Sequence, residues 1–103
     1  MTNKHLKRLD KLNTTECLWI YILKILTKGP SHAYVLRKQI EQEFGFRPGT
    51  VTAYRVLYDL QKIGLVRKHK ECMKRIYEIT TKGKSDLKSA VDYYNNLAKK
   101  LGK

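Results

Sequence analysis

Residues 75–83 read RIYEITTKG, and this stretch decides the fold when it is taken together with the residues that precede it. Its side chains alternate with the period of two that is typical of a short strand, Arg75, Tyr77 and Ile79 against Ile76, Glu78 and Thr80. A second short strand is expected over residues 65–69, and a basic turn over residues 70–74 joins the two. An amphipathic helix that ends at Gly64 comes before this hairpin. A helix followed by a basic two-stranded hairpin is typical of a winged helix-turn-helix.

Three helices are expected upstream of the hairpin. The first starts at Thr14 or Thr15, either of which can cap it, and ends at Gly29-Pro30. We expect it to be central, because its apolar residues form one stripe: Leu18, Ile22, Ile25 and Leu26. The second spans about residues 32–44, is capped by Ser31, and buries Val35, Leu36, Ile40 and Phe44. The third spans about residues 51–63, is capped by Thr50, and has an inner face of Ala53, Val56, Leu57, Leu60 and Ile63.

The two ends of the chain carry further helical patterns. Residues 1–13 are basic, with three leucines at a spacing of three, so they form either a short amphipathic helix or a frayed arm. Thr80 or Thr81 is expected to open a last helix over about residues 85–101. The sequence thus predicts a mostly α-helical chain with a small two-stranded β-wing. We divide it into an arm or short helix (1–13), a winged-helix DNA-binding domain (14–80) and a C-terminal dimerisation helix (81–103).

The charge of the chain points to a polyanionic partner. It carries 22 Lys and Arg residues against 9 Asp and Glu residues, a formal net charge of +13 over 103 residues. Nucleic acid is the first candidate for such a partner, and an anionic membrane surface is the second. No apolar run approaches the roughly 20 residues that span a bilayer, and the N-terminus lacks the apolar core of a signal peptide. We therefore expect a soluble, cytoplasmic, nucleoid-associated protein with no membrane partner.

Cysteines, histidines and known catalytic motifs give no sign of a metal site or an enzyme. Cys17 and Cys72 lie too far apart for a zinc site, so two free thiols are expected, with a disulfide left open. His5, His32 and His69 are scattered in the sequence and are expected at the surface or at helix caps. No nucleophile elbow, P-loop, dinucleotide-binding or HExxH pattern is present. The chain is expected to bind no metal or cofactor and to catalyse no reaction.

The third predicted helix is the candidate recognition helix, which in a helix-turn-helix lies in the major groove. Its arginine can bind guanine through two hydrogen bonds or hold a phosphate, and its hydroxyl groups can donate to phosphates. The alternative is an ordinary solvated helix face, but two exposed tyrosines beside an arginine, with one acid on the whole helix, favour DNA contact. The candidate residues of this helix are Thr50, Thr52, Tyr54, Arg55, Tyr58 and Lys62.

The predicted hairpin is a candidate DNA-binding wing because it is dense in cations and carries Glu71 as its one acid between Gly64 and Ile76. Such density suits the phosphate backbone or an arginine that enters the minor groove. A charged edge that blocks strand pairing between molecules is the other interpretation, and both can hold. The candidate wing residues are Arg67, Lys68, Lys70, Lys74 and Arg75.

The last predicted helix carries an apolar stripe at spacings of three and four, which is typical of a helix that packs along another. It can fold back onto its own domain or pair with a second copy of the chain. Pairing is favoured, because the first three helices already share a core and an operator reader gains from two-fold symmetry. The candidate dimer residues are Leu87, Ala90, Val91, Tyr94, Leu97, Ala98 and Leu101.

Three ordered stretches resemble the PadR family of winged-helix transcriptional regulators. Residues 29–36, GPSHAYVL, resemble the family's GPxHGYxL. Residues 52–66, with Tyr54 and the GLV at their end, resemble TVYPALxxLxxxGLI. Residues 75–83 resemble RxYxLTxxG. The chain departs from the family at Ala33, where glycine is usual, at Arg55, where proline is frequent, and in a Pro48-Gly49-Thr50 triplet two positions early.

The resemblance implies a homodimer joined through the C-terminal helix, with the wing and third helix on DNA and Tyr54 on the backbone. It also implies repression and a small-molecule effector near the dimer interface, for which Trp19 and the C-terminal tyrosines are candidate pocket walls, although a tryptophan in an apolar stripe also suits a plain core. We therefore predict a sequence-specific, double-stranded DNA-binding repressor. The alternatives are an abundant, weakly specific chromatin protein and a winged helix for protein assembly, which the basic wing disfavours.

Overall fold

The computed structural model describes residues 3–71 and 74–103, and its most buried helix is the one expected to be central, α2 (Leu18–Leu26). All four residues of the predicted apolar stripe are buried, together with Leu23. α3 (Ala33–Phe44) and α4 (Thr50–Lys62) pack on α2, and the base of the hairpin closes the same core. Three residues that the sequence predicted to lie in the core are instead exposed: Val35, Phe44 and Ile63.

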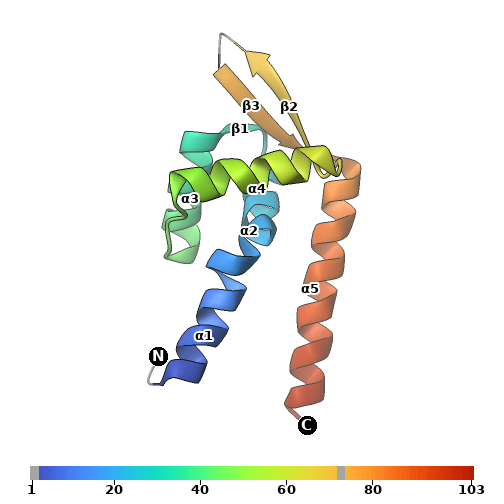
Figure 1. Ribbon diagram of the computed structural model, residues 1–103. Helices are drawn as coiled ribbons and strands as arrows, with labels where there is room; N and C mark the ends of the chain where they lie inside the picture. The colour runs from blue at the N-terminus through green and yellow to red at the C-terminus, as the bar shows by residue number, and fades with distance from the viewer. Residues whose placement is uncertain (1–2, 72–73) are drawn as a thin grey trace.

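The elements radiate from this core in two directions, as Figure 1 shows. The hairpin of β2 (Val66–Glu71) and β3 (Lys74–Ile79) projects from one end. α1 (Lys4–Asn13), which a short 3₁₀ turn over Thr15–Cys17 joins to α2, and α5 (Thr81–Leu101) extend from the other end, where both chain termini lie. The principal extents of 51 × 27 × 21 Å reflect this elongated arrangement.

The sheet has three strands rather than the two predicted, in the order β1-β3-β2. The extra strand is β1 (Ser31–His32), which pairs antiparallel with β3 in the register Ser31 to Tyr77. Ile76 and Tyr77 of β3, the middle strand, are both buried, and because adjacent residues of a strand point to opposite faces, both faces of β3 are covered here. The predicted alternation therefore identified the strand but not its burial on both faces.

Three helix starts differ from the predictions. Thr14 does not cap α2, because its hydroxyl donates to the Asp10 carbonyl at the end of α1. Ser31 does not cap α3, because it belongs to β1 and donates to the His32 carbonyl. Thr50 is the first residue of α4 rather than its cap, which is Gly49. For Thr14 and Ser31, a hydrogen bond to a nearby carbonyl replaces the expected cap.

The end of α4 is as predicted, and it is closed by a left-handed residue. Gly64 has φ of +84°, a conformation that glycine adopts without steric cost. The Leu65 amide then donates to the Leu60 carbonyl at 2.8 Å and the Gly64 amide to the Gln61 carbonyl at 3.1 Å. This is the double hydrogen bond of a Schellman motif, and the buried Leu60 and Leu65 supply its apolar contact.

α5 begins directly on this helix end. Thr80 caps α5, as predicted, by accepting the Gly83 amide at 3.0 Å, and α5 therefore starts four positions earlier than residue 85. The Thr80 hydroxyl also donates to the Gly64 carbonyl at 2.7 Å, and its amide donates to the Leu65 carbonyl at 3.1 Å. Lys82 Nζ reaches the Ile63 carbonyl at 3.0 Å. We call this set of contacts the α4–α5 junction.

Residues 4–13 form a helix, which was one of the two alternatives for the N-terminal segment. Asn3 caps α1 by accepting the Leu6 amide at 2.9 Å. α1 buries none of its side chains, and its three leucines, Leu6, Leu9 and Leu12, are all exposed. α1 is therefore an amphipathic helix whose apolar side is in contact with solvent.

Gly83→Ala tests the α4–α5 junction. A Cβ at this position would lie 2.2 Å from the Leu65 carbonyl oxygen, which is backbone and cannot swing aside. Helix propensity alone would make alanine about 1 kcal/mol better than glycine here. We expect the opposite sign, a loss of about 1–3 kcal/mol in the free energy of unfolding, from overpacking.

The measurement is urea unfolding followed by circular dichroism. Ser85→Ala, at an exposed position of the same helix, is the matched control and should change the free energy by less than about 0.5 kcal/mol. A Gly83→Ala protein that is more stable than wild type would show that the junction is not tightly packed.

Candidate nucleic-acid interface

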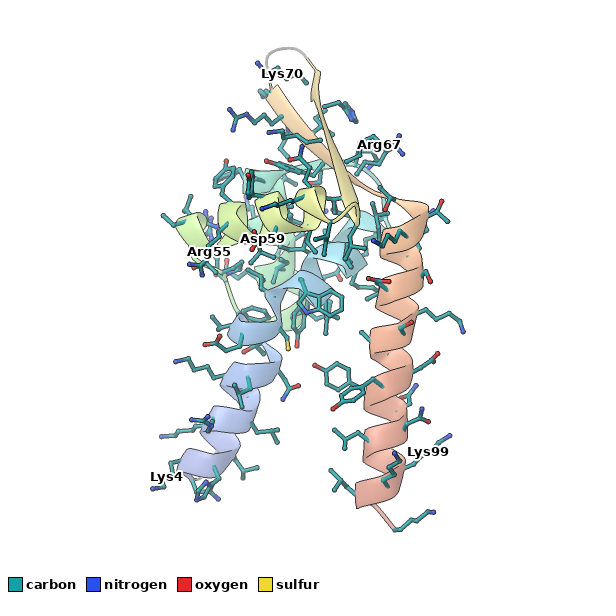
Figure 2. All side chains as sticks on the ribbon, turned by 45° about the vertical axis from the view of Figure 1, so that its right-hand side comes forward. Lys4, Arg55, Asp59, Arg67, Lys70 and Lys99 are labelled. Carbon is teal, nitrogen blue, oxygen red and sulfur yellow. The ribbon has the colours of Figure 1, made fainter. Side chains whose placement is uncertain are left out.

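The outer face of α4 carries the residues that the sequence proposed for the recognition helix. Thr50, Tyr54, Arg55, Tyr58 and Lys62 are exposed, and Thr52 is half-buried. The inner face is made by the buried Ala53, Leu57 and Leu60, which pack into the core. Burial of one face thus holds the helix while the opposite face stays free, and Figure 2 shows Arg55 on the outside of α4.

The wing cations are all exposed: Arg67, Lys68, Lys70, Lys74 and Arg75. In the register of β2 and β3, Lys70 lies opposite Arg75, whereas Lys68 lies opposite Tyr77. Arg67 Nη1 lies 3.7 Å from Glu78 Oε1 on the neighbouring strand. Because this ion pair is exposed to water, it contributes little to stability. Lys70 lies near the tip of the hairpin, whereas Lys4 and Lys99 mark the far ends of α1 and α5 (Figure 2).

A hollow of about 500 Å³ separates the wing from α4, and the sequence did not predict it. Its walls come from the start of α3, from Tyr54 of α4 and from β3, and they bring together His32, Tyr34, Tyr54, Lys74, Arg75 and Tyr77. His32 Nδ1 lies 3.2 Å from the Arg75 carbonyl oxygen, which joins two walls of the hollow. Tyr54, Lys74 and Arg75 were candidates, whereas the other three residues were missed.

The three missed residues lie in sequence motifs that were used only to place a helix and a strand. His32 and Tyr34 belong to the GPSHAYVL stretch, which served to mark a helix start, and Tyr77 served to mark a strand. Their meeting requires the pairing of β1 with β3, a contact between residues 31 and 77. Local periodicity carries no information on such a long-range pairing.

The apolar stripe of α5 divides between two environments. Leu87, Ala90 and Tyr94 are half-buried, and Leu87 packs against the core. The Tyr94 hydroxyl donates to Asn13 Oδ1 at 2.8 Å, and burial raises the pKa of Tyr94 to about 12. The remaining members are exposed: Val91, Leu97, Ala98 and Leu101. The first half of α5 therefore folds back on its own chain, and the second half does not.

A second hollow, of about 460 Å³, lies between α2 and α5. Trp19, Tyr93 and Tyr94 line it, as the sequence proposed for an effector pocket, and Cys17 lies beside them. Trp19 is only partly buried where it packs against the core, and it also lines this hollow. Cys17 carries a free thiol, and Cys72 lies outside the described residues.

Within residues 3–71 and 74–103, no three side chains of His, Cys, Asp or Glu come together as a metal ion would need. None of the helices described there is both long enough and apolar enough to cross a bilayer.

Taken together, the three helices of the core and the basic hairpin that follows α4 define a winged helix-turn-helix protein. Residues 22–89, which span the core, wing and start of α5, match the model of the transcriptional regulator PadR-like family. This match covers more than half of the chain, and the chain belongs to that family of transcriptional regulators. The resemblance found in the sequence is therefore confirmed. No curated protein matches the chain in sequence.

Solved structures share the fold at low sequence identity. A transcriptional regulator from Clostridium thermocellum aligns with a TM-score of 0.74 and 22% identity, over 82% of this chain and 88% of its own. A PadR family transcription regulator from Clostridium difficile aligns with a TM-score of 0.74 and 21% identity, over 82% and 93%. Bacillus subtilis PadR, solved in complex with operator DNA, aligns with a TM-score of 0.62 and 25% identity, over 72% of this chain and 46% of its own.

Proposed function

We propose that this regulator is a sequence-specific, double-stranded DNA-binding repressor that acts as a homodimer. The observation that carries the proposal is a single exposed surface of tyrosines, arginines and lysines that spans α4 and the wing. The acidic residues of α4 and the two hairpin strands are Asp59, Glu71 and Glu78, and Glu78 lies beside Arg67. The operator complex of Bacillus subtilis PadR supports the same use of the fold.

In this proposal, α4 lies in the major groove and the wing lies on the backbone or in the minor groove. Arg55 is the residue with the geometry to bind a guanine edge through two hydrogen bonds. Thr50, Thr52, Tyr54, Tyr58 and Lys62 surround it, and the five wing cations neutralise phosphates. The protein is then expected to be cytoplasmic and associated with the nucleoid, with residues 14–80 as its DNA-binding domain.

Homodimerisation through residues 81–103 is proposed from the exposed half of the α5 stripe. Val91, Leu97 and Leu101 leave large apolar surfaces in water, and so do the three leucines of α1. Scattered apolar side chains are normal on a surface, but two neighbouring helices that each leave an apolar face open are typical of an interface. A second copy with the same surface can cover both helices, because a two-fold interface is self-complementary.

The small-molecule effector is proposed for the hollow between α2 and α5. Trp19, Tyr93 and Tyr94 provide flat apolar walls with hydroxyl groups at their edges, which suits a small aromatic ligand. The site lies where α5 meets its own domain, so a ligand there can change the angle of the helix proposed to join the dimer.

Selection of bound duplexes from a random library is the experiment that tests the function. A palindromic consensus is expected, because a two-fold dimer reads two half-sites. If no consensus emerges and affinity falls steeply with salt, the protein is instead a weakly specific chromatin protein. That second candidate has the charge of +13 in its favour, because phosphate contacts supply most of non-specific affinity.

Arg55→Ala and Lys70→Ala separate base reading from phosphate binding. We expect Arg55→Ala to reduce the preference for the selected duplex over an unrelated one by about 1–3 kcal/mol. Lys70→Ala should weaken both duplexes equally and lower the slope of log K against log salt by about 0.9. Fluorescence anisotropy at several salt concentrations measures both quantities.

Lys99→Ala is the control, because Lys99 lies at the end of the molecule opposite the wing (Figure 2) and should change neither quantity. Equal loss on both duplexes after Arg55→Ala would assign Arg55 to the backbone and remove it from base recognition.

Leu97→Asp tests the dimer. A carboxylate at this exposed apolar position would lie in the interface without a partner, and burial of an unpaired charge costs several kcal/mol. We expect the mass measured by light scattering to fall to half. Asn96→Asp introduces the same charge at an exposed position one residue away, on another face of α5, and should leave the dimer intact. An unchanged mass for Leu97→Asp would show that the stripe is not the interface.

A further inference from the structure

The hollow between the wing and α4 has the features of an anion site built from three separate elements. The start of α3, the outer edge of α4 and the strand β3 each contribute one tyrosine, Tyr34, Tyr54 and Tyr77. Lys74 and Arg75 bring positive charge from β3, and no carboxylate is present among the described residues that line it. The site lies in the corner between the two surfaces proposed to touch DNA.

The first turn of α3 opens into this hollow. The amides of Ala33, Tyr34 and Val35 have no partners within the helix, as at the start of any helix. No side chain caps them, because Ser31 is turned to the His32 carbonyl and His32, at the cap position, does not accept from the helix. Free amides at the positive end of a helix dipole attract a negative charge.

Tyr77 is an independent sign that a ligand belongs here. The residue is 4% exposed, and the tyrosine hydroxyls that form hydrogen bonds among the described residues are those of Tyr21 and Tyr94, so the Tyr77 hydroxyl forms none there. Among the described residues, Gln39 Oε1 is the side-chain polar atom that is fully buried and has no hydrogen-bond partner. The Tyr77 hydroxyl has no partner either but is not fully buried, so it remains accessible to solvent. A tyrosine buried in a protein usually pairs its hydroxyl, so this donor faces the hollow in need of an acceptor.

Burial raises the pKa of Tyr77, so its hydroxyl keeps its proton and remains a donor throughout the working range of pH. It differs in this from Lys74 and Arg75, which attract an anion through charge. A neutral buried donor adds direction but no charge, and its contribution can be separated from theirs by salt dependence.

We propose that this hollow seats one backbone phosphate of the bound DNA strand, with Tyr77 and the first-turn amides of α3 as its hydrogen-bond donors. A volume of about 500 Å³ exceeds the needs of a phosphate alone, and the rings of Tyr34 and Tyr54 offer flat apolar walls to the adjoining deoxyribose. The seat rests on the proposed DNA binding and adds a third contact region to α4 and the wing. It fixes the position of the strand without reading its sequence.

Tyr77→Phe is the decisive variant, because it removes one hydroxyl and keeps the buried ring. We expect about a tenfold loss of affinity, as for one hydrogen bond to a charged group, on the selected and the unrelated duplex alike. The salt slope should stay unchanged, since a neutral phenol releases no counterion, whereas Lys74→Ala should lower it by about 0.9. Tyr21→Phe is the matched control, because it removes a hydroxyl that bonds the Asn13 carbonyl away from this hollow, and it should bind as wild type.

A scan of duplexes with single neutral methylphosphonates then identifies the phosphate. In wild type, we expect one position per half-site at which the substitution weakens binding most. In Tyr77→Phe, the substitution at that position should cost about tenfold less than it does in wild type. If Tyr77→Phe also shifts the unfolding midpoint, a second readout in the wild-type protein replaces it. The amide chemical shifts of Tyr34 and Val35 are then compared between the complex with the plain duplex and the complex with the substituted duplex, and they should differ.

The outcomes distinguish this seat from the proposed function. A wild-type protein that binds no duplex would overturn DNA binding and the seat with it. Wild-type binding together with an unaffected Tyr77→Phe protein, or amide shifts that ignore the substituted phosphate, would overturn the seat alone.

Discussion

The α4–α5 junction is the constraint on which the rest of the molecule depends. The carbonyls of Ile63, Gly64 and Leu65, which follow the last turn of α4, accept hydrogen bonds from the residues that begin α5. Thr80 takes part as donor and as cap at once, and Gly83 lets the two backbones approach to a distance that no Cβ permits. The end of α4, the base of the wing and the start of α5 are thereby joined by hydrogen bonds at one point of the molecule. A contact that reorients α5 would therefore act on the end of α4.

The arrangement of charge follows from the same geometry. A chain with 22 cations and 9 acids repels itself, and the two-ended shape spreads this charge along 51 Å. Cations gather on the wing at one end and on α1 and the last turns of α5 at the other, as Lys70, Lys4 and Lys99 illustrate (Figure 2). A DNA duplex would neutralise the first group. The second group lies beside the exposed leucines of α1 and α5, so an interface formed there would be apolar at its centre and charged at its rim.

Local signals in the sequence were sufficient for much of the fold. The stripe of α2, the glycine that ends α4 and the threonine that opens α5 each act within a few residues, and each was predicted correctly. Failures occurred where distant segments meet. β1 exists because residue 31 pairs with residue 77, and this pairing removes Ser31 from its expected role as a cap. The same pairing creates the hollow of Tyr77, so one missed contact accounts for both the extra strand and the unpredicted part of the site.

Regulation by a small molecule would have to act through the junction. The hollow beside Trp19 touches α2 and α5 but not the outer face of α4, so its ligand and DNA bind to different surfaces. A ligand shifts DNA affinity only if it binds better to one position of α5 than to another. Because the junction joins α5 to the end of α4, a small rotation of α5 in a dimer would change the spacing between the two copies of α4, to which half-site recognition would be sensitive. A loose junction would absorb that rotation, and the close contact of Gly83 with Leu65 is therefore what would allow a ligand at Trp19 to be felt at the operator.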